Sequence, residues 1–169
     1  LLLDIPVTSI GMNSYYCNVN LVYNSKYSNY SFFDRQIGFN NGFKLNIEQH
    51  IFSYREEYNI PEFTEEDYVY IDSEYRIHRF TKPLYSTGNM YYDKTNGNLY
   101  LYVNSDNTFK MTDDNDNEFY FDTNGRLVRM VSNTNNNIEK KIKYENNVIT
   151  EYYDNREINK KIDIDYITE

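Results

Sequence analysis

The sequence predicts an all-β protein, built as an antiparallel meander of successive hairpins that form a curved, twisted sheet. The first observation is composition, since the 169 residues include 25 Asn, 20 Tyr and 10 Phe but no Ala. Ala is the best helix former, Asn favours turns, and Tyr and Phe suit a pleated, half-buried surface. The second is apolar residues that alternate with polar ones, and the third is regularly spaced turn signals.

Period-two alternation marks four expected strands, each with one apolar and one polar face. In the first, at 15–23, Cys17, Val19 and Leu21 share the apolar face. In the second, at 43–48, the apolar residues at 43, 45 and 47 alternate with polar ones, and we place His50 on the polar face of this strand. The third and fourth are the segments 98–103 and 161–166.

Turn signals separate the expected strands and recur roughly every 9 to 12 residues from residue 90 onward. Two of them contain Asn-Gly, the strongest short hairpin signal, because both residues tolerate positive φ. We expect one domain over 1–169, with a less regular opening region at 1–89 and hairpins at 90–169. The signals lie at 72–74, 95–97, 104–107, 113–117, 122–125, 132–137, 145–147 and 154–156.

Charge and residue counts exclude several function classes. The formal charge of −9 argues against binding a phosphate backbone, which requires clustered Lys and Arg. No apolar run approaches the ~18–20 residues that cross a bilayer, so we expect neither membrane insertion nor a nucleic-acid partner. One Cys and two His leave few ligands for zinc, and we expect no cofactor. Because the chain starts at Leu1 without a charged leader, we expect a piece of a longer polypeptide.

An internal repeat appears when the aromatic-Asp pairs are aligned. The segment from Tyr92 and Asp93 to Gly97 runs parallel to Phe121, Asp122, Gly125, Arg126 and Leu127. An aromatic strand ends, Asp opens the turn, Gly supplies positive φ, and an aliphatic residue starts the return strand. If Gly125 has positive φ, a β-branched residue there should cost about 1–2 kcal/mol. Weaker echoes lie at 144–148 and 152–158.

At these residues the chain resembles the YD-repeat, or RHS-repeat, proteins. Their signature is Tyr-Asp-x-x-Gly-Arg-Leu, and 121–127 matches it at every position except the first, where Phe121 replaces Tyr. Upstream, the strand pair at 70–72 and 76–80 resembles the region that opens such cores. A Gly-x-Gly-Trp box is similar to Gly38 through Phe43, with Phe43 for Trp and two additional residues between the glycines.

The resemblance implies a structural, non-catalytic function. In this family many repeats wind a β-sheet into a hollow shell, which in polymorphic toxins encloses a C-terminal effector. The expected partners are the remainder of the chain's own polypeptide, with further repeats and an enclosed effector. Unpaired sheet edges also favour edge-strand self-association. The resemblance implies a secreted or cell-envelope-associated bacterial protein. The alternative is a carbohydrate- or receptor-binding β-domain of a surface or phage-tail protein.

Few residues are candidates for chemistry. Cys17 reads as a small buried hydrophobe rather than a nucleophile, because only His50 or His78 is available as a base. We expect both histidines to be surface or cross-strand residues. Tyr16, Tyr100 and Tyr102 point away from the aliphatic face and provide the rings for the carbohydrate alternative.

Acidic residues form two kinds of candidate site. Oxygen ligands crowd into the turn at 113–118, but the EF-hand pattern fails, which leaves an irregular calcium site or a solvated acidic turn. Paired carboxylates suit a glycosidase only if they face each other across a cleft at ~5–9 Å, and a solvated face is the other interpretation. The turn residues are Asp113, Asp114, Asp116 and Glu118, and the pairs are Glu56 with Glu57, Glu65 with Glu66, and Asp163 with Asp165.

Overall fold

Two antiparallel sheets make up the chain in a computed structural model that describes residues 1–10, 17–26, 43–95, 97–133, 138–145, 148–154 and 161–163. The smaller sheet has the order β1 (Leu2–Ile10), β2 (Cys17–Asn24) and β3 (Phe43–Leu45). The larger has 11 strands, each hydrogen-bonded to its neighbour in sequence from β4 to β14. The predicted all-β antiparallel meander is therefore confirmed. Among the described residues the only helical element is the 3₁₀ helix η3 (Glu56–Tyr58).

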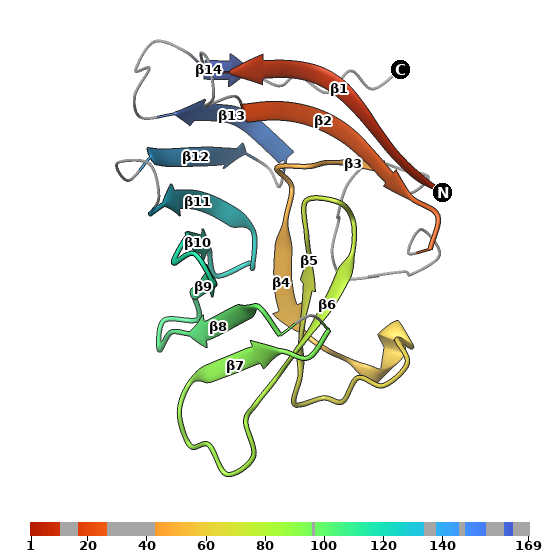
Figure 1. Ribbon diagram of the computed structural model, residues 1–169, viewed down its shortest axis with the longest axis vertical. Helices are drawn as coiled ribbons and strands as arrows, with labels where there is room; N and C mark the ends of the chain where they lie inside the picture. The colour runs from red at the N-terminus through yellow and green to blue at the C-terminus, as the bar shows by residue number, and fades with distance from the viewer. Residues whose placement is uncertain are drawn as a thin grey trace.

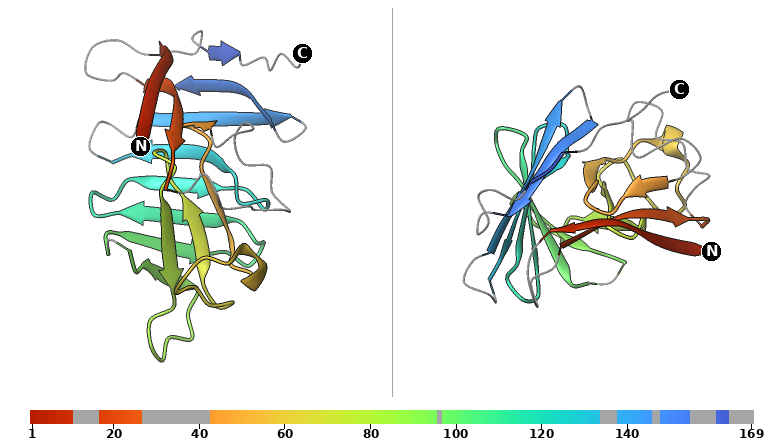
Figure 2. Two further views of the ribbon diagram at one scale, coloured as in Figure 1. Left: turned by 90° about the vertical axis from the view of Figure 1, so that its right-hand side faces the viewer. Right: turned by 90° about the horizontal axis from the view of Figure 1, so that it is seen from above.

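The larger sheet is strongly curled into a half-barrel (Figure 1). β4 to β6 cross the stack that begins at β7, and the views in Figure 2 show this stack as a twisted ladder. The bend lies between β6 and β7, which pair at only two positions, Phe80 with Asp93 and Thr81 with Tyr92. The strands are β4 (His50–Ser53), β5 (Tyr68–Ile71), β6 (Ile77–Thr81), β7 (Met90–Asp93), β8 (Leu99–Val103), β9 (Phe109–Asp113), β10 (Glu118–Phe121), β11 (Leu127–Ser132), β12 (Ile138–Glu145), β13 (Val148–Asp154) and β14 (Lys161–Asp163).

Apolar side chains are buried on both faces of β4 to β6. On the concave face of the half-barrel, Ile51, Tyr70 and Phe80 join a core that continues along the later strands and includes Val19 and Leu45 of the smaller sheet. The second core covers the opposite face of β4 to β6. It contains Phe52, Tyr54, Tyr58, Ile60, Val69, Ile71 and Ile77.

The structure corrects the expected strand at 43–48. β3 ends at Leu45, the chain turns at 46–47, and His50 begins β4, so His50 is not on the polar face of that strand. His50 is buried, and so is Lys44, which the alternation predicts on a polar face. Val22, on the polar side of the first pattern, is buried as well. Alternation identified which side chains share a face, but several of the polar faces are covered.

The strand predicted at 98–103 matches β8. Leu101 is fully buried on the concave face, whereas Tyr100 points to the opposite, outer face and is 36% exposed. The hairpin of 70–72 and 76–80 is also found, as β5 and β6. Of the strand expected at 161–166, β14 covers the described part.

Each sheet ends in two strands that pair with one neighbour, β1 and β3 in the smaller sheet and β4 and β14 in the larger one. β1 exposes Leu2, Ile5 and Val7 to solvent. No helix in the described part of the chain is long and apolar enough to cross a membrane.

Candidate functional site

The turn between β10 and β11 shows what the repeat signature does. Asp122 N–H donates to the carbonyl of Arg126 at 2.9 Å, and Gly125 N–H donates to the carbonyl of Asp122 at 2.8 Å. The Asp122 carboxylate then accepts the backbone N–H groups of Asn124 and Arg126, each at 2.9 Å, and the Arg126 Nε at 2.9 Å. Gly125 has φ +75°, as predicted. This is a hairpin turn closed by a left-handed residue and locked by an Asp–Arg ion pair.

The same Asp-centred turn recurs at two other hairpins, in one of them with the Asp–Arg ion pair. At 72–76, Asp72 accepts the N–H of Glu74 and of Arg76 together with the Arg76 Nε, and Tyr75 is the left-handed residue. At 113–117 the carboxylate of Asp113 accepts two backbone N–H groups and the Asn117 side-chain amide. The turn is thus a repeated unit in which Asp organises the backbone and the fifth residue closes it.

Both apolar positions of the signature, Phe121 and Leu127, belong to the concave core. The Arg126 guanidinium lies 4.6 Å from the ring centroid of Tyr144 on β12, and the Tyr144 hydroxyl donates to the Leu127 carbonyl at 2.9 Å. Arg126 therefore connects its own turn to the next strand through a cation–π contact.

Gly125 also binds the turn to the far end of the sheet. Its carbonyl accepts the Ile51 N–H of β4 at 2.7 Å, and Leu127 N–H donates to the Gln49 carbonyl at 3.0 Å. A Cβ on Gly125 would lie 1.7 Å from the Ile51 carbonyl oxygen. Glycine is required here for close approach as well as for its positive φ.

Asp93, which the repeat aligns with Asp122, takes part in a buried charge cluster. Its turn contains Gly97 at φ +77° and lacks an Arg, and the Asp93 Oδ2 instead contacts His78 Nδ1 at 3.0 Å. The other ring nitrogen of His78 contacts Asp72 Oδ2, also at 3.0 Å. The His78 ring thus bridges the carboxylates of two turns.

Electrostatics make this bridge a stable ion triad. Burial lowers the pKa of His78, but the two carboxylates outweigh burial and raise it to about 9. Burial also disfavours the charged form of Asp72 and by itself would raise its pKa. Hydrogen bonds from His78 and Arg76 outweigh burial and lower the pKa of Asp72 to about 2. At neutral pH His78 is a cation with both N–H groups donated to carboxylates. It has no free lone pair to act as a general base.

Lys44 forms a second buried charge next to this triad. Its ammonium donates to the carbonyls of Glu48 at 2.9 Å, Leu45 at 3.2 Å and Ser73 at 3.5 Å, and it lies 5.9 Å from the ring centroid of Tyr75. Burial lowers the pKa of Lys44 to about 8, against the raising effect of the Glu48 and Asp72 charges. Its contacts fasten the smaller sheet to the β5–β6 turn.

The outer face of the half-barrel carries a ladder of paired polar side chains. The Tyr120 ring lies between Lys110, whose ammonium is 5.8 Å from the centroid, and Arg129, whose guanidinium carbon is 4.7 Å away. Glu118 pairs with Lys110 and accepts the Tyr120 hydroxyl at 2.5 Å. Arg129 pairs with Glu139. These cross-strand pairs stabilise the sheet and satisfy one another's charges.

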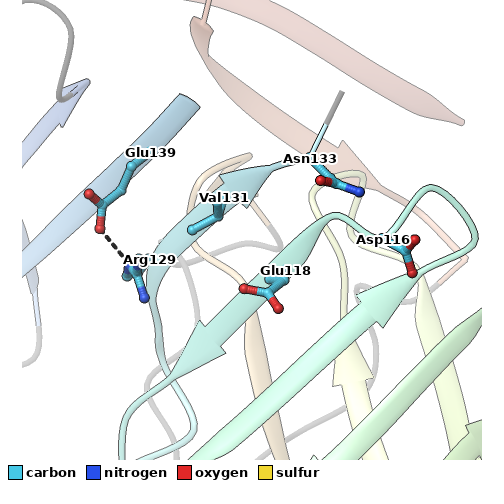
Figure 3. Close-up of a pocket in the computed structure, with 6 residues that line it drawn as sticks. All are labelled: Asp116, Glu118, Arg129, Val131, Asn133 and Glu139. Carbon is cyan, nitrogen blue, oxygen red and sulfur yellow. Dashed lines mark hydrogen bonds and ion pairs between the residues drawn. The ribbon is translucent and has the colours of Figure 1, made fainter. Parts of the chain in front are cut away.

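An open depression of about 570 Å³ lies beside this ladder, and Figure 3 labels the residues that line it. Its lining mixes carboxylates with an arginine that is already paired to Glu139. The remaining carboxylates do not converge, because no group of three or more His, Cys, Asp or Glu among the described residues is placed to hold a metal ion. The lining residues are Asp116, Glu118, Arg129, Val131, Asn133 and Glu139.

The remaining candidate site residues are either engaged in structural contacts or lie outside the described residues. Asp113 is engaged in its own turn and Glu118 with Lys110 and Tyr120, so two oxygen ligands of the suggested calcium site are occupied. His78 is the expected cross-strand residue, paired with Tyr70, but it is buried rather than on the surface. His50 is paired with Ile71. The side chains of Tyr16, Cys17, Asp163 and Asp165, and the segment 38–42, lie outside the described residues.

Sequence reasoning missed the charge cluster of Lys44, Asp72, His78 and Asp93. The signal for part of it was present, because Asp72 and Asp93 both occupy the position that Asp122 has in the signature. Nothing in the pattern marked either side chain as buried, because Lys44 alternates with apolar residues like a solvent-facing side chain and His78 stands between Ile77 and Arg79.

Comparison of the chain with protein-family models, with curated proteins and with solved structures produced no match in any of the three.

Proposed function

We propose that the chain is a structural β-scaffold, a section of a YD-repeat shell of the toxin-encapsulating type. The observation that carries the proposal is the use of the signature residues. Each of Phe121, Asp122, Gly125, Arg126 and Leu127 is engaged in the core, in the turn lock or in docking onto β4. These contacts stabilise the sheet and leave none of the five residues free for binding or chemistry.

The recurrence of the turn supports the same proposal. A scaffold made of stacked hairpins requires a turn that sets register without help from a distant part of the chain. The Asp-centred turns at 72–76, 113–117 and 122–126 have this property, because their hydrogen bonds lie within five residues. Further repeats would extend the sheet by pairing with β14, which has a neighbour on one side in the described sheet.

The buried triad of Asp72, His78 and Asp93 supports a non-catalytic role as well. A catalytic histidine needs a pKa near the working pH and an accessible ring nitrogen. His78 has a raised pKa of about 9 and both nitrogens in contact with carboxylates. The triad joins two neighbouring turns and so stabilises the sheet.

Hydrogen exchange on the whole natural polypeptide that contains this chain tests the proposal. We expect the amides of β14 to be slow in that polypeptide and fast in the isolated chain, and a downstream effector segment to resist protease until the shell is opened. Fast β14 amides in both, or a polypeptide without further aromatic-Asp repeats, would contradict the scaffold.

The alternative, a carbohydrate- or receptor-binding domain, depends on the outward tyrosines. Tyr100 is 36% exposed and Tyr102 half-buried on the outer face. A glycan array separates the two functions. Binding that is abolished in Tyr100→Ala or Tyr102→Ala favours the alternative, whereas an array without signal favours the scaffold.

A further inference from the structure

A second cavity lies where the concave face of the half-barrel reaches solvent near the β6–β7 bend. It has a volume of about 370 Å³, within the ~300–1,000 Å³ range of small-ligand sites. Tyr68 and Tyr91 belong to the concave face, where they pack against the core, and their rings meet edge to face with centroids 4.9 Å apart. The cavity is lined by Ser53, Glu65, Glu66, Asp67, Tyr68, Lys82 and Tyr91.

Negative charge is in excess at this cavity. Three consecutive carboxylates line it, from Glu65 to Asp67. Asp67 is paired with Arg79 at 2.9 Å, and Lys82 is the cation in the lining. Glu65 and Glu66 are exposed and form no ion pair with the residues that the structure describes. Burial, the neighbouring Tyr68 and the carboxylate of Glu66 raise the pKa of Tyr91, and the Glu66 charge is the source of negative potential at its ring.

Asp67 is a buried carboxylate beside the cavity, and one of its oxygens lacks a donor among the described residues. Its side chain is fully buried, and its Oδ2 accepts Thr64 N–H at 2.7 Å, the Thr64 hydroxyl at 3.0 Å and Arg79 Nε. Its Oδ1 is also buried but accepts no hydrogen bond from any described residue. A buried carboxylate oxygen without a donor is destabilising. The Asp67 side chain has no exposed surface, so it adds negative charge beside the cavity without contacting a ligand in it.

Lys82 shows which ligand chemistry the aromatic wall attracts. Its ammonium lies 5.6 Å from the centroid of the Tyr91 ring, a cation–π distance. Lys82 is itself exposed and stands at the start of the loop between β6 and β7. This loop projects beyond the sheet (Figure 1) and presents Leu84, 88% exposed, and Tyr85, 100% exposed. Adjacent apolar, aromatic and charged groups are typical of protein–protein contact sites.

We propose that this cavity binds the side-chain cation of a lysine or arginine on a protein segment, with Leu84 and Tyr85 packing against apolar residues that flank the cation. The carboxylates provide the charge, the tyrosine rings provide the cation–π surface, and the loop tip provides apolar contact. Lys82 occupies the edge of the site and competes with the incoming cation. This inference is independent of the scaffold proposal.

Calorimetric titration of the chain with three probes tests the proposal. The probes are a short blocked peptide with one arginine between leucines, the same peptide with citrulline, which keeps the shape but loses the charge, and arginine amide. We expect the arginine peptide to bind and the citrulline peptide to bind at least about tenfold more weakly. Equal binding of both peptides, or no binding of the arginine peptide up to about 1 mM, overturns the proposal.

Matched variants locate the site. Glu65→Gln with Glu66→Gln should weaken the arginine peptide about tenfold, whereas Glu56→Gln with Glu57→Gln, an equal charge change on the exposed η3, should leave affinity unchanged. Lys82→Gln should tighten binding several-fold, because it removes the competing cation. Equal losses in the two Glu pairs would mean non-specific charge attraction and overturn the site.

A loop variant separates a protein segment from a free cation. Leu84→Ser with Tyr85→Ser should weaken the peptide and leave arginine amide unchanged, which supports the docking of a protein segment. If arginine amide binds as tightly as the peptide and the loop variant affects neither, the protein-segment assignment is wrong and the site is one for a free organic cation.

Discussion

Gly125 offers the sharpest test of how the half-barrel closes, because a side chain there would meet two separate obstacles, an unfavourable backbone angle and a steric clash with β4. Its φ of +75° disfavours any L-residue, and a Cβ would lie 1.7 Å from the Ile51 carbonyl oxygen. Gly97 provides the matched control. Its φ is +77°, yet a Cβ there meets nothing within 4 Å. Gly97→Ala therefore measures the backbone effect alone, and Gly125→Ala measures backbone and contact together.

The magnitudes follow from the contacts. The left-handed backbone should cost about 1–2 kcal/mol in each Ala variant. At Gly125 the turn must also retreat from β4 until the Cβ reaches ordinary contact at 3.4 Å. That retreat breaks the 2.7 Å bond from Ile51 N–H and strains the 3.0 Å bond from Leu127 N–H to Gln49. With about 1 kcal/mol or more for each buried bond, we expect Gly125→Ala to lose about 3–5 kcal/mol in all.

Urea unfolding followed by circular dichroism gives both free energies, and equal m-values validate the comparison. Replacement by Asn separates the two effects, because Asn tolerates the left-handed region. Gly97→Asn should be nearly neutral, whereas Gly125→Asn should remain strongly destabilised. If Gly125→Ala costs no more than Gly97→Ala, the turn does not dock on β4 and the argument for closure is refuted.

Two further predictions concern the charge locks. His78 binds its proton more tightly in the folded chain, with a pKa of about 9 against 6.5, so its stabilisation is complete below pH 6.5 and is lost as the pH rises towards 9. Urea unfolding should show a decline of about 3 kcal/mol from His78 across this window, offset above pH 8 where Lys44 has the opposite effect. A His78→Gln profile that is flat between pH 6.5 and 8 and rises above pH 8 would support the assignment, while an unchanged decline would contradict it. Asp122→Asn should cost about 1–3 kcal/mol by weakening the Arg126 lock, whereas the exposed control Asp114→Asn should stay within about 0.5 kcal/mol; similar values for both would argue against the lock.

The strands and turns of the meander followed from local chemistry. Period-two alternation placed Leu101 inward and Tyr100 outward on β8, and the structure agrees. The roles of Asp122 and Gly125 in their turn were also predictable, because the bonds that define it join residues within one five-residue segment. Side-chain periodicity and turn chemistry depend on residues a few positions apart, and both can therefore be predicted from a single sequence.

Burial of the polar faces was decided by the tertiary structure. Lys44 alternates with Phe43 and Leu45, but alternation states which side chains share a face and not what covers that face, and no local pattern marked His78 as buried. The bend between β6 and β7 and the packing of the smaller sheet cover those faces. Because β6 pairs with both β5 and β7, Asp72 and Asp93 contact the same histidine. The contact of Gly125 with Ile51 has the same origin, since it joins segments far apart in the chain whose approach depends on the curl of the whole sheet.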